Sequence, residues 1–248
     1  IIAPFLIKGT IDDLNFVVTA DGKNYARIKG KTGLTSEAFK SNPIFDTIRN
    51  HGHEFGHCAK KTVVFRQLAS RFNKLAKEGS FAGRANKLLF EILQEDTSQP
   101  QGKRTLSEAL KTSGAKELLL GFESNRTRPL HKVLKIKEQY NQDKQTVTLT
   151  DFSPGDHLDW PQEATHVVFA SATANWDPEN DTFHSCYSQE IILDKESPMQ
   201  TITLITAKPQ GNNLQLSFLF IGFDIQQRKK FKMLHRKNNT ATLIAYHN

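Results

Sequence analysis

Cysteine is scarce in this chain of 248 residues: Cys58 and Cys186 are the only two, and they lie far apart in segments of different character. Small domains held together by disulfides carry several cysteines at regular spacing, so that class is excluded and two free thiols are expected. Long apolar runs are missing as well. Stretches such as 63–65 and 218–221 fall far short of the ~20 residues that cross a bilayer, so no membrane span is expected.

The strings that mark several catalytic and phosphate-binding sites are also absent. The chain has no G-x-S-x-G elbow, no Walker loop and no G-x-G-x-x-G fingerprint. It contains no internal repeat and no low-complexity tract. On this basis we expect no cofactor, and no residue stands out as catalytic.

The composition that is present is typical of a globular protein, with 38% hydrophobic and 24% charged residues and a net charge of +7. The positive charge is not evenly shared. Residues 1–116 carry 19 Lys or Arg against 11 Asp or Glu, whereas residues 117–248 carry 14 against 15. The basic excess therefore belongs to the first half, where an anionic partner is conceivable.

Residues 1–116 begin with a strand-like pattern and continue with helical periods. Apolar stretches at 6–11 and 14–19 precede Asp21-Gly22, a strong hairpin-turn signal, after which 25–28 would pair back. Helical spacing is found near 36–49, over 59–77, from Ser80 to about residue 93, and at 105–110. This half is predicted to be a β-hairpin followed by a basic helical segment.

Residues 117–248 have a strand pattern to the end. Strands are expected at 118–122, 133–137, 146–150, 166–172, 183–193, 201–206, 214–223 and 240–246. Seven or eight short strands over about 130 residues are typical of an antiparallel sandwich of immunoglobulin-like type. The predicted fold class is therefore α+β, with a first domain at 1–116 and an immunoglobulin-like β-sandwich domain at 117–248.

The string His53-Glu54-Phe55-Gly56-His57 fits the H-E-x-x-H pattern of zinc peptidases. On a helix, the two histidines would face the same way and bind zinc, and the glutamate would be the base that activates a metal-bound water. The surroundings argue against this, because Lys60 and Lys61 follow and Val63 stands where the metzincin extension needs a third histidine. A zinc-dependent peptidase or hydrolase, with ligands His53 and His57 and base Glu54, is an alternative interpretation.

Six cations accompany the apolar stripe of the helix predicted at 59–77: Lys60, Lys61, Arg66, Arg71, Lys74 and Lys77. They are candidates for binding an anionic partner such as a nucleic acid, although a solvated outer face is the simpler interpretation. A second cluster follows in a predicted hairpin: Arg228, Lys229, Lys230, Lys232, Arg236 and Lys237. Nucleic-acid binding is a second alternative, which no helix-turn-helix, zinc-finger or RNP string accompanies.

Several strings together point to a family. They are Ile7-Lys8-Gly9-Thr10-Ile11-Asp12-Asp13-Leu14-Asn15-Phe16, Thr19-Ala20-Asp21-Gly22, Arg49 with Glu54-Phe55-Gly56, Gly121-Phe122 and Ala164-Thr165-His166-Val167. In these strings and in length the chain resembles an uncharacterised family of flavobacteria and related Bacteroidota, over most of its length. That family has no assigned activity and supplies no catalytic residue. In its pattern Glu-Phe-Gly lacks the flanking histidines, which implies that the H-E-x-x-H match is accidental.

The function favoured by the sequence is a non-enzymatic structural or interaction protein, an assembly subunit that acts through protein–protein contacts. Sandwiches expose strand edges and loops to partners, and an amphipathic helix can dock on a neighbour. Self-association through the N-terminal strands or the helix is a hypothesis, with a second copy of the chain as the partner.

Overall fold

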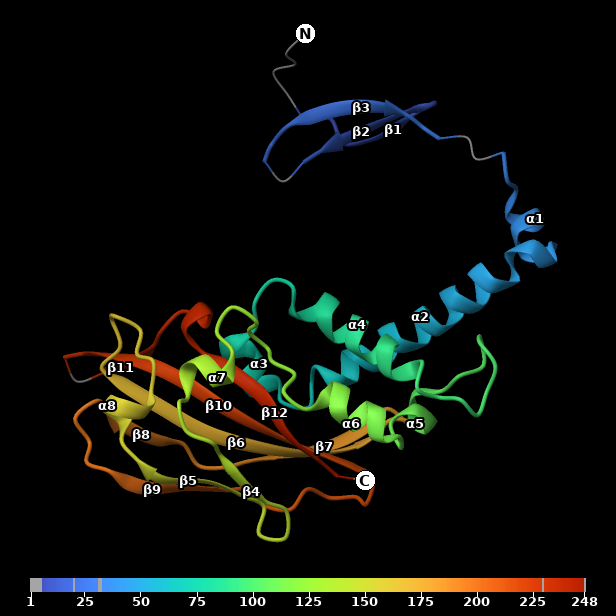
Figure 1. Cartoon of the computed structure of the whole chain (residues 1–248). Helices are drawn as coiled ribbons and strands as arrows, with labels where there is room; N and C mark the ends of the chain where they lie inside the picture. Colours follow the sequence, from blue (N-terminus) through green and yellow to red (C-terminus); the bar gives the residue numbers. More distant parts are fainter. Residues whose placement is uncertain (1–5, 20, 31–32, 229, 248) are drawn as a thin grey trace. The chain divides into compact units, whose positions relative to one another are not determined.

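The computed structural model describes residues 6–19, 21–30, 33–228 and 230–247 (Figure 1). Its internal contacts divide the chain into two compact units, 1–49 and 50–248. This division differs from the domain boundary predicted at residue 116. The helices that follow residue 50 share one buried core with the strands beyond residue 166, so they belong to the same unit as those strands.

The first unit holds a three-stranded antiparallel sheet. Its strands are β1 (Gly9–Ile11), β2 (Leu14–Val18) and β3 (Asn24–Ile28), paired in the order β1-β2-β3. β2 and β3 flank the Asp21-Gly22 turn, in which Gly22 has a positive φ of 79° that favours glycine. Next come α1 (Ser36–Ser41), which Thr35 caps through its hydroxyl, and the 3₁₀ turn η1 (Pro43–Phe45). β1 thus adds a third strand to the predicted hairpin.

Five helices come next along the chain: α2 (Asp46–Phe65), α3 (Ser70–Ala76), α4 (Phe81–Leu93), α5 (Leu106–Ala109) and α6 (Ser113–Leu119). The single helix predicted at 59–77 is wrong, because the chain turns between α2 and α3. Leu68 and Ala69 are buried in that turn, and the side-chain amide of Asn73 donates to the carbonyl of Arg66 at 2.8 Å. The predicted apolar stripe is buried, but two helices carry it.

The turn lets both helices place an aromatic ring on the large sheet. The ring of Phe65, at the end of α2, lies 6.0 Å from the ring of Trp176, measured between centroids. The ring of Phe72, in α3, stacks on Phe220 at 5.1 Å. A continuous helix would carry these two side chains about 10 Å apart along one straight axis.

The remaining strands form two antiparallel sheets. The smaller sheet has the order β4-β5-β9 and consists of β4 (Gln139–Asn141), β5 (Thr146–Phe152) and β9 (Gln200–Ile205). The larger sheet consists of β6 (His166–Asp177), β7 (Thr182–Tyr187), β8 (Ile191–Asp194), β10 (Leu214–Gln227), β11 (Lys230–Met233) and β12 (Thr240–His247). Its order is β11-β10-β6-β7, with β12 beside β10 and β8 beside β6. Three short helical turns lie in connections: α7 (Leu130–Val133), α8 (Pro154–His157) and η2 (Arg236–Asn238).

Two of the predicted strands are not strands. The stretch 118–122 overlaps the end of α6, and 133–137 begins at the end of α7. The buried residues of the two helices are spaced three or four apart, Ala115 with Leu119 in α6 and Leu130 with Val133 in α7, and a short apolar run of this kind does not by itself distinguish a strand from a helix. The strand predicted at 183–193 is divided into β7 and β8.

The large sheet is buried on both faces because its two central strands carry apolar side chains alternately up and down. On β6, Ala170, Ala172 and Ala174 face the helices, and the small side chains leave room for them. Phe169 of β6 and Leu219 of β10 face the smaller sheet instead. Figure 1 shows the resulting layers: helices, large sheet and small sheet. The second unit is therefore a mixed α/β structure with antiparallel sheets.

Part of the space between the two sheets is polar. The hydroxyl of Thr173 on β6 lies 3.0 Å from the hydroxyl of Thr206 and 3.2 Å from that of Ser217 on β10. Ser217 donates to the phenol oxygen of Tyr140 on β4 at 2.9 Å, and the amide of Gln215 donates to the same oxygen at 3.3 Å. This network ties three strands together by hydrogen bonds among buried side chains.

Candidate functional site

The glutamate of the H-E-x-x-H string holds a loop against α2. Glu54 is 3% exposed, and its Oε1 accepts a hydrogen bond from the backbone N–H of Gly102 at 2.8 Å. Gly102 has a φ of +94°, and a Cβ there would lie 2.6 Å from the side chain of Asn50, so this close approach requires glycine. The Nε of Arg104 is 3.9 Å from the same carboxylate oxygen. Glu54 is therefore an anchor for the loop.

The two histidines of the string have different surroundings. His53 is exposed, whereas His57 is half-buried and its Nε2 accepts a hydrogen bond from the backbone N–H of Leu106 at 3.4 Å. Burial, followed by the charge of Lys61, lowers the pKa of His57 and keeps the imidazole neutral. Within the described ranges, no group of three or more His, Cys, Asp or Glu side chains is arranged to hold a metal ion. The contacts of Glu54 and His57 thus serve the packing of α2.

Three of the six cations predicted to bind an anionic partner are engaged within the chain. Lys61 is 7% exposed, and its Nζ lies 2.9 Å from Oδ1 of Asp181. Arg71 pairs with Glu190 at 2.5 Å, and Arg66 donates to a backbone carbonyl one turn earlier. The other three, Lys60, Lys74 and Lys77, are exposed. Because the chain also turns between α2 and α3, the six do not line one helix face.

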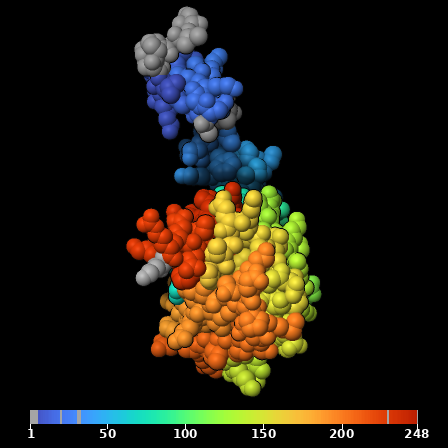
Figure 2. All heavy atoms as spheres, turned by 90° about the vertical axis from the view of Figure 1, so that its left-hand side faces the viewer, coloured from blue at the N-terminus to red at the C-terminus, as the bar shows by residue number. Residues whose placement is uncertain are grey.

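The second predicted basic cluster lies around β11 and η2. It comprises Arg228, Lys230, Lys232, Arg236 and Lys237, and Lys229 lies outside the described residues. In Figure 2 the red segment that contains them projects from one side of the visible face. The ring of Phe231 packs edge-on against His166 at 4.8 Å between centroids. This aromatic residue therefore contributes to packing between neighbouring parts of the sheet.

The strand register of the first unit separates its side chains into two faces. Leu14 lies opposite both Ile11 and Ile28, and Phe16 lies opposite Gly9 and Ala26. Because side chains alternate along a strand, these residues share one face with Val18. The other face carries Thr10, Asn15, Val17, Tyr25 and Arg27. We call the first the apolar strand face, defined by Ile11, Leu14, Phe16, Val18, Ala26 and Ile28.

The apolar strand face is not covered within its own unit. Ile28 is 77% exposed, Ile11 57% and Leu14 43%. Among the described residues of β1, β2, β3 and α1, none is buried. A small antiparallel sheet with uncovered apolar side chains gains stability when another surface packs on it. This face is the candidate interaction surface.

The sequence pointed to the N-terminal strands for self-association without pointing to these residues. The available signal was the alternation of Leu14, Phe16 and Val18 in β2. Ile11 and Ile28 lie in separate segments, and only the register of three strands brings them beside Leu14 in one row.

Comparisons with known proteins match nothing. A scan against models of protein families found no matching family, and searches of curated proteins and of solved structures found no similar protein. In the part of the chain that the structure describes, no helix is both long enough and apolar enough to pass through a membrane.

Proposed function

We propose that this chain is a non-enzymatic interaction protein, an assembly subunit that associates through protein–protein contacts. The observation that carries the proposal is the apolar strand face, a row of large aliphatic side chains with Ile28 77% exposed. Burying one such side chain contributes about 1.5–3 kcal/mol. A surface that covers this face therefore gains a favourable contact and stabilises the sheet.

We propose a second copy of the chain as the occupant. The face has no charged side chain, and Asn24, which shares it at the end of β3, is polar but neutral. The charge of this unit is also nearly balanced: residues 1–49 carry seven Lys or Arg and five Asp or Glu, against twelve and six in residues 50–116. Two copies can therefore meet at this face with little repulsion, in the two-fold arrangement usual for homodimers.

The test uses the full chain and two adjacent positions on β2. Leu14→Glu places a charge on the apolar strand face, and Asn15→Glu places the same charge on the opposite face. The expected result is a wild-type dimer at high concentration, a dissociation constant raised by about tenfold or more in Leu14→Glu, and an unchanged dimer in Asn15→Glu. Sedimentation equilibrium measures all three.

A monomeric wild type at every concentration overturns the proposal, and so does equal weakening by both substitutions. Because Leu14→Glu can also disturb the sheet, Ile28→Glu is a second variant. Ile28 is the most exposed of the three residues in the row, so the substitution leaves the isolated fold little changed. Circular dichroism of each variant shows that the strands are retained.

Two finer assignments belong to the same proposal. We propose that residues 117–248 are a variant of the immunoglobulin-like sandwich, supported by the packing of one antiparallel sheet on another, with helices added on the outer face. We also propose the relationship to the uncharacterised Bacteroidota family, supported by the strings quoted above.

A further inference from the structure

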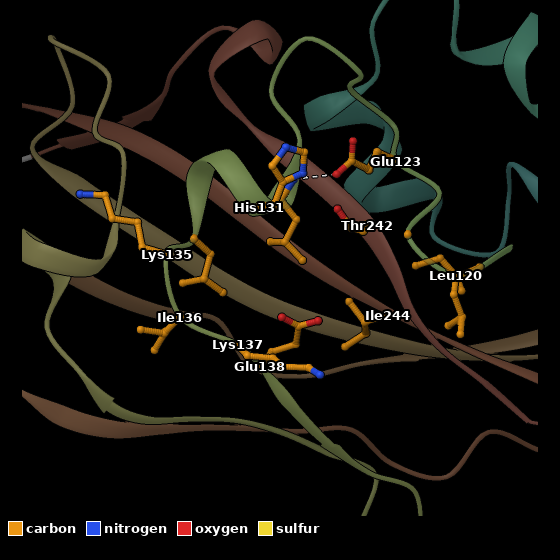
Figure 3. Close-up of a pocket in the computed structure, with 13 residues that line it drawn as sticks. Leu120, Glu123, His131, Lys135, Ile136, Lys137, Glu138, Thr242 and Ile244 are labelled. Carbon is orange, nitrogen blue, oxygen red and sulfur yellow. Dashed lines mark hydrogen bonds between the residues drawn. The ribbon is translucent and has the colours of Figure 1, made fainter. Parts of the chain in front are cut away.

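The second unit contains an open cavity of about 680 Å³ beneath β12. One wall is formed by β12 and the segment 120–123 that runs beside it, and the other by α7 and the segment 134–138. Its volume lies in the range of about 300–1,000 Å³ typical of small-molecule sites. Figure 3 shows Glu123, Thr242 and His131 together at one end, and Ile136 and Ile244 on opposite sides of the lower part.

The polar end is built from two facing strand segments. Glu123 and Thr242 are direct partners in an antiparallel bridge, so their side chains leave the backbone on the same side. One carboxylate oxygen of Glu123 accepts a hydrogen bond from the backbone N–H of Leu130 at 2.7 Å. The hydroxyl of Thr242 is buried and has no hydrogen-bond partner. A buried hydroxyl without a partner beside a carboxylate leaves a place for a donor that satisfies both.

The negative charge of Glu123 is not neutralised by a direct ion pair with any cation in the described ranges. The guanidinium of Arg84 pairs with Glu78 at 2.9 Å and donates to the backbone carbonyl of Glu123 rather than to its carboxylate. The ammonium of Lys135 donates to the carbonyl of Asp156 at 3.0 Å. Burial raises the pKa of Glu123, and the hydrogen bond from Leu130 and the charges of His131 and Arg84 oppose that rise only in part.

The rest of the cavity favours an aliphatic body. Leu134 is buried, and Ile136 and Ile244 are half-buried and line the middle of the cavity (Figure 3). Ile136 and Ile244 belong to segments more than a hundred residues apart in the sequence. Their methyl groups can contact a flexible hydrocarbon chain. In the same view His131 lies beside Glu123, and Lys137 and Glu138 lie between Ile136 and Ile244 (Figure 3).

We propose that this cavity binds a small aliphatic amine, with its ammonium group held by Glu123 and Thr242 and its hydrocarbon chain packed on Ile136 and Ile244. The ammonium group supplies three N–H donors, one of them for the carboxylate oxygen left by Leu130 and one for the Thr242 hydroxyl. The site goes beyond the proposed self-association, since every residue that forms it lies in the second unit.

The test compares three probes of equal chain length: n-hexylamine, hexanoate and 1-hexanol. They are titrated into the full chain, and backbone amide shifts are followed by NMR. The expected result is that hexylamine binds most tightly, by about tenfold over hexanoate, and that the shifts fall on segments 120–123, 130–138 and 242–244. Self-association is measured separately, so failure of one proposal leaves the other standing.

Three variants locate the ammonium group. Glu123→Gln keeps the oxygen that Leu130 needs and removes the charge, so hexylamine binding weakens by about tenfold or more. Thr242→Val removes the hydroxyl at equal volume and weakens binding by about twofold to fivefold. Glu138→Gln, which removes the other carboxylate that lines the cavity, is the control and changes binding by less than about twofold.

The proposal is overturned by any of three outcomes. Hexanoate that binds as tightly as hexylamine contradicts the role of the carboxylate. Unchanged hexylamine binding in Glu123→Gln contradicts the position of the ammonium group. Amide shifts that fall outside the three segments contradict the location of the binding site. The absence of shifts with all three probes contradicts binding in the cavity.

Discussion

Glu54 resembles a catalytic base in sequence and serves as a loop anchor in the structure. Its carboxylate accepts from Gly102 and lies near Arg104. Glu54→Gln is expected to lower the free energy of unfolding by about 1–2 kcal/mol, because an uncharged amide accepts a weaker hydrogen bond. Gly102→Ala is expected to cost more, since its Cβ meets Asn50. Urea unfolding measures both, and equal stability of the wild type and Glu54→Gln would contradict the anchor.

The two cysteines are both free, as expected from the sequence, but they differ in burial. Cys58 is fully buried, and burial, with a smaller effect of Glu54, raises its thiol pKa to about 12. The thiolate is the reactive form, so Cys58 is inert near neutral pH. Titration with a thiol reagent is expected to modify Cys186 first, and Cys58 only on unfolding. The control is the Cys186→Ser variant, in which Cys58 is the remaining thiol. Fast labelling of this variant in the folded state near neutral pH would contradict the inert state of Cys58.

Asp224 is 6% exposed on β10, and its Oδ1 has no hydrogen-bond partner. Burial, and then the charge of Glu190, raises its pKa above the ordinary value of 3.8, whereas His166 lowers it. A raised pKa means that the folded state holds this proton more tightly than the unfolded chain. Stability is therefore lost as the pH rises from 3.8 through the raised pKa, and the loss is complete above it.

Asp224→Asn removes that loss because an amide does not ionise. The variant is expected to be more stable than the wild type by about 1 kcal/mol at neutral pH, and the difference is expected to shrink as the pH falls toward 3.8. Denaturant unfolding at a series of pH values measures it. A difference that stays constant with pH would show that ionisation of Asp224 is not its cause.

At the level of elements, the turn between α2 and α3 depends on one side chain. Asn73 donates to the carbonyl of Arg66 and accepts from the hydroxyl of Ser124. Asn73→Ala leaves the buried hydroxyl of Ser124 and the carbonyl of Arg66 without this partner, so we expect a loss of about 2 kcal/mol in the free energy of unfolding. Lys74→Ala, at the next and exposed position, is the control and is expected to change stability by less than about 0.5 kcal/mol. Thermal unfolding compares the two, and equal losses would contradict the role of the amide.

Local patterns predicted many elements and missed where they join. The strands predicted at 146–150, 166–172, 201–206, 214–223 and 240–246 match observed strands to within one residue. β6 and β10 are continuous apolar runs buried on both faces, and β9 alternates between exposed and buried residues. The apolar period at 59–77 predicted the buried side but not the turn, which requires Asn73 to reach back to a carbonyl. The stretch 118–122 has the composition of a strand, and its spacing with Ala115 suits a helix equally well.

For the whole molecule, the two buried cores contain no residue of the first unit. The chain 50–248 is therefore expected to fold alone, with a melting temperature within about 3 °C of the full chain. Differential scanning calorimetry of the two proteins measures this. Loss of a cooperative transition in the shorter chain would show that residues 1–49 are part of its fold.

The candidate sites were the least accessible to sequence reasoning. The apolar strand face needs the register of three strands, which a pattern along one strand does not contain. The cavity joins Glu123 to Thr242, and its aliphatic wall joins Ile136 to Ile244. None of these pairs has a fixed spacing that a motif can describe, because each depends on which strands lie side by side.

The hydroxyl network between the two sheets has a consequence for how β10 aligns with β6. Sliding β10 by two residues keeps every side chain on its own side, so apolar burial alone tolerates the error. The slide moves Ser217 by roughly 7 Å, away from Thr173 and Tyr140, and breaks the hydrogen bonds that join its hydroxyl to theirs. The hydrogen bonds among these hydroxyls thus favour one register of β10 against β6, which apolar contacts alone do not determine.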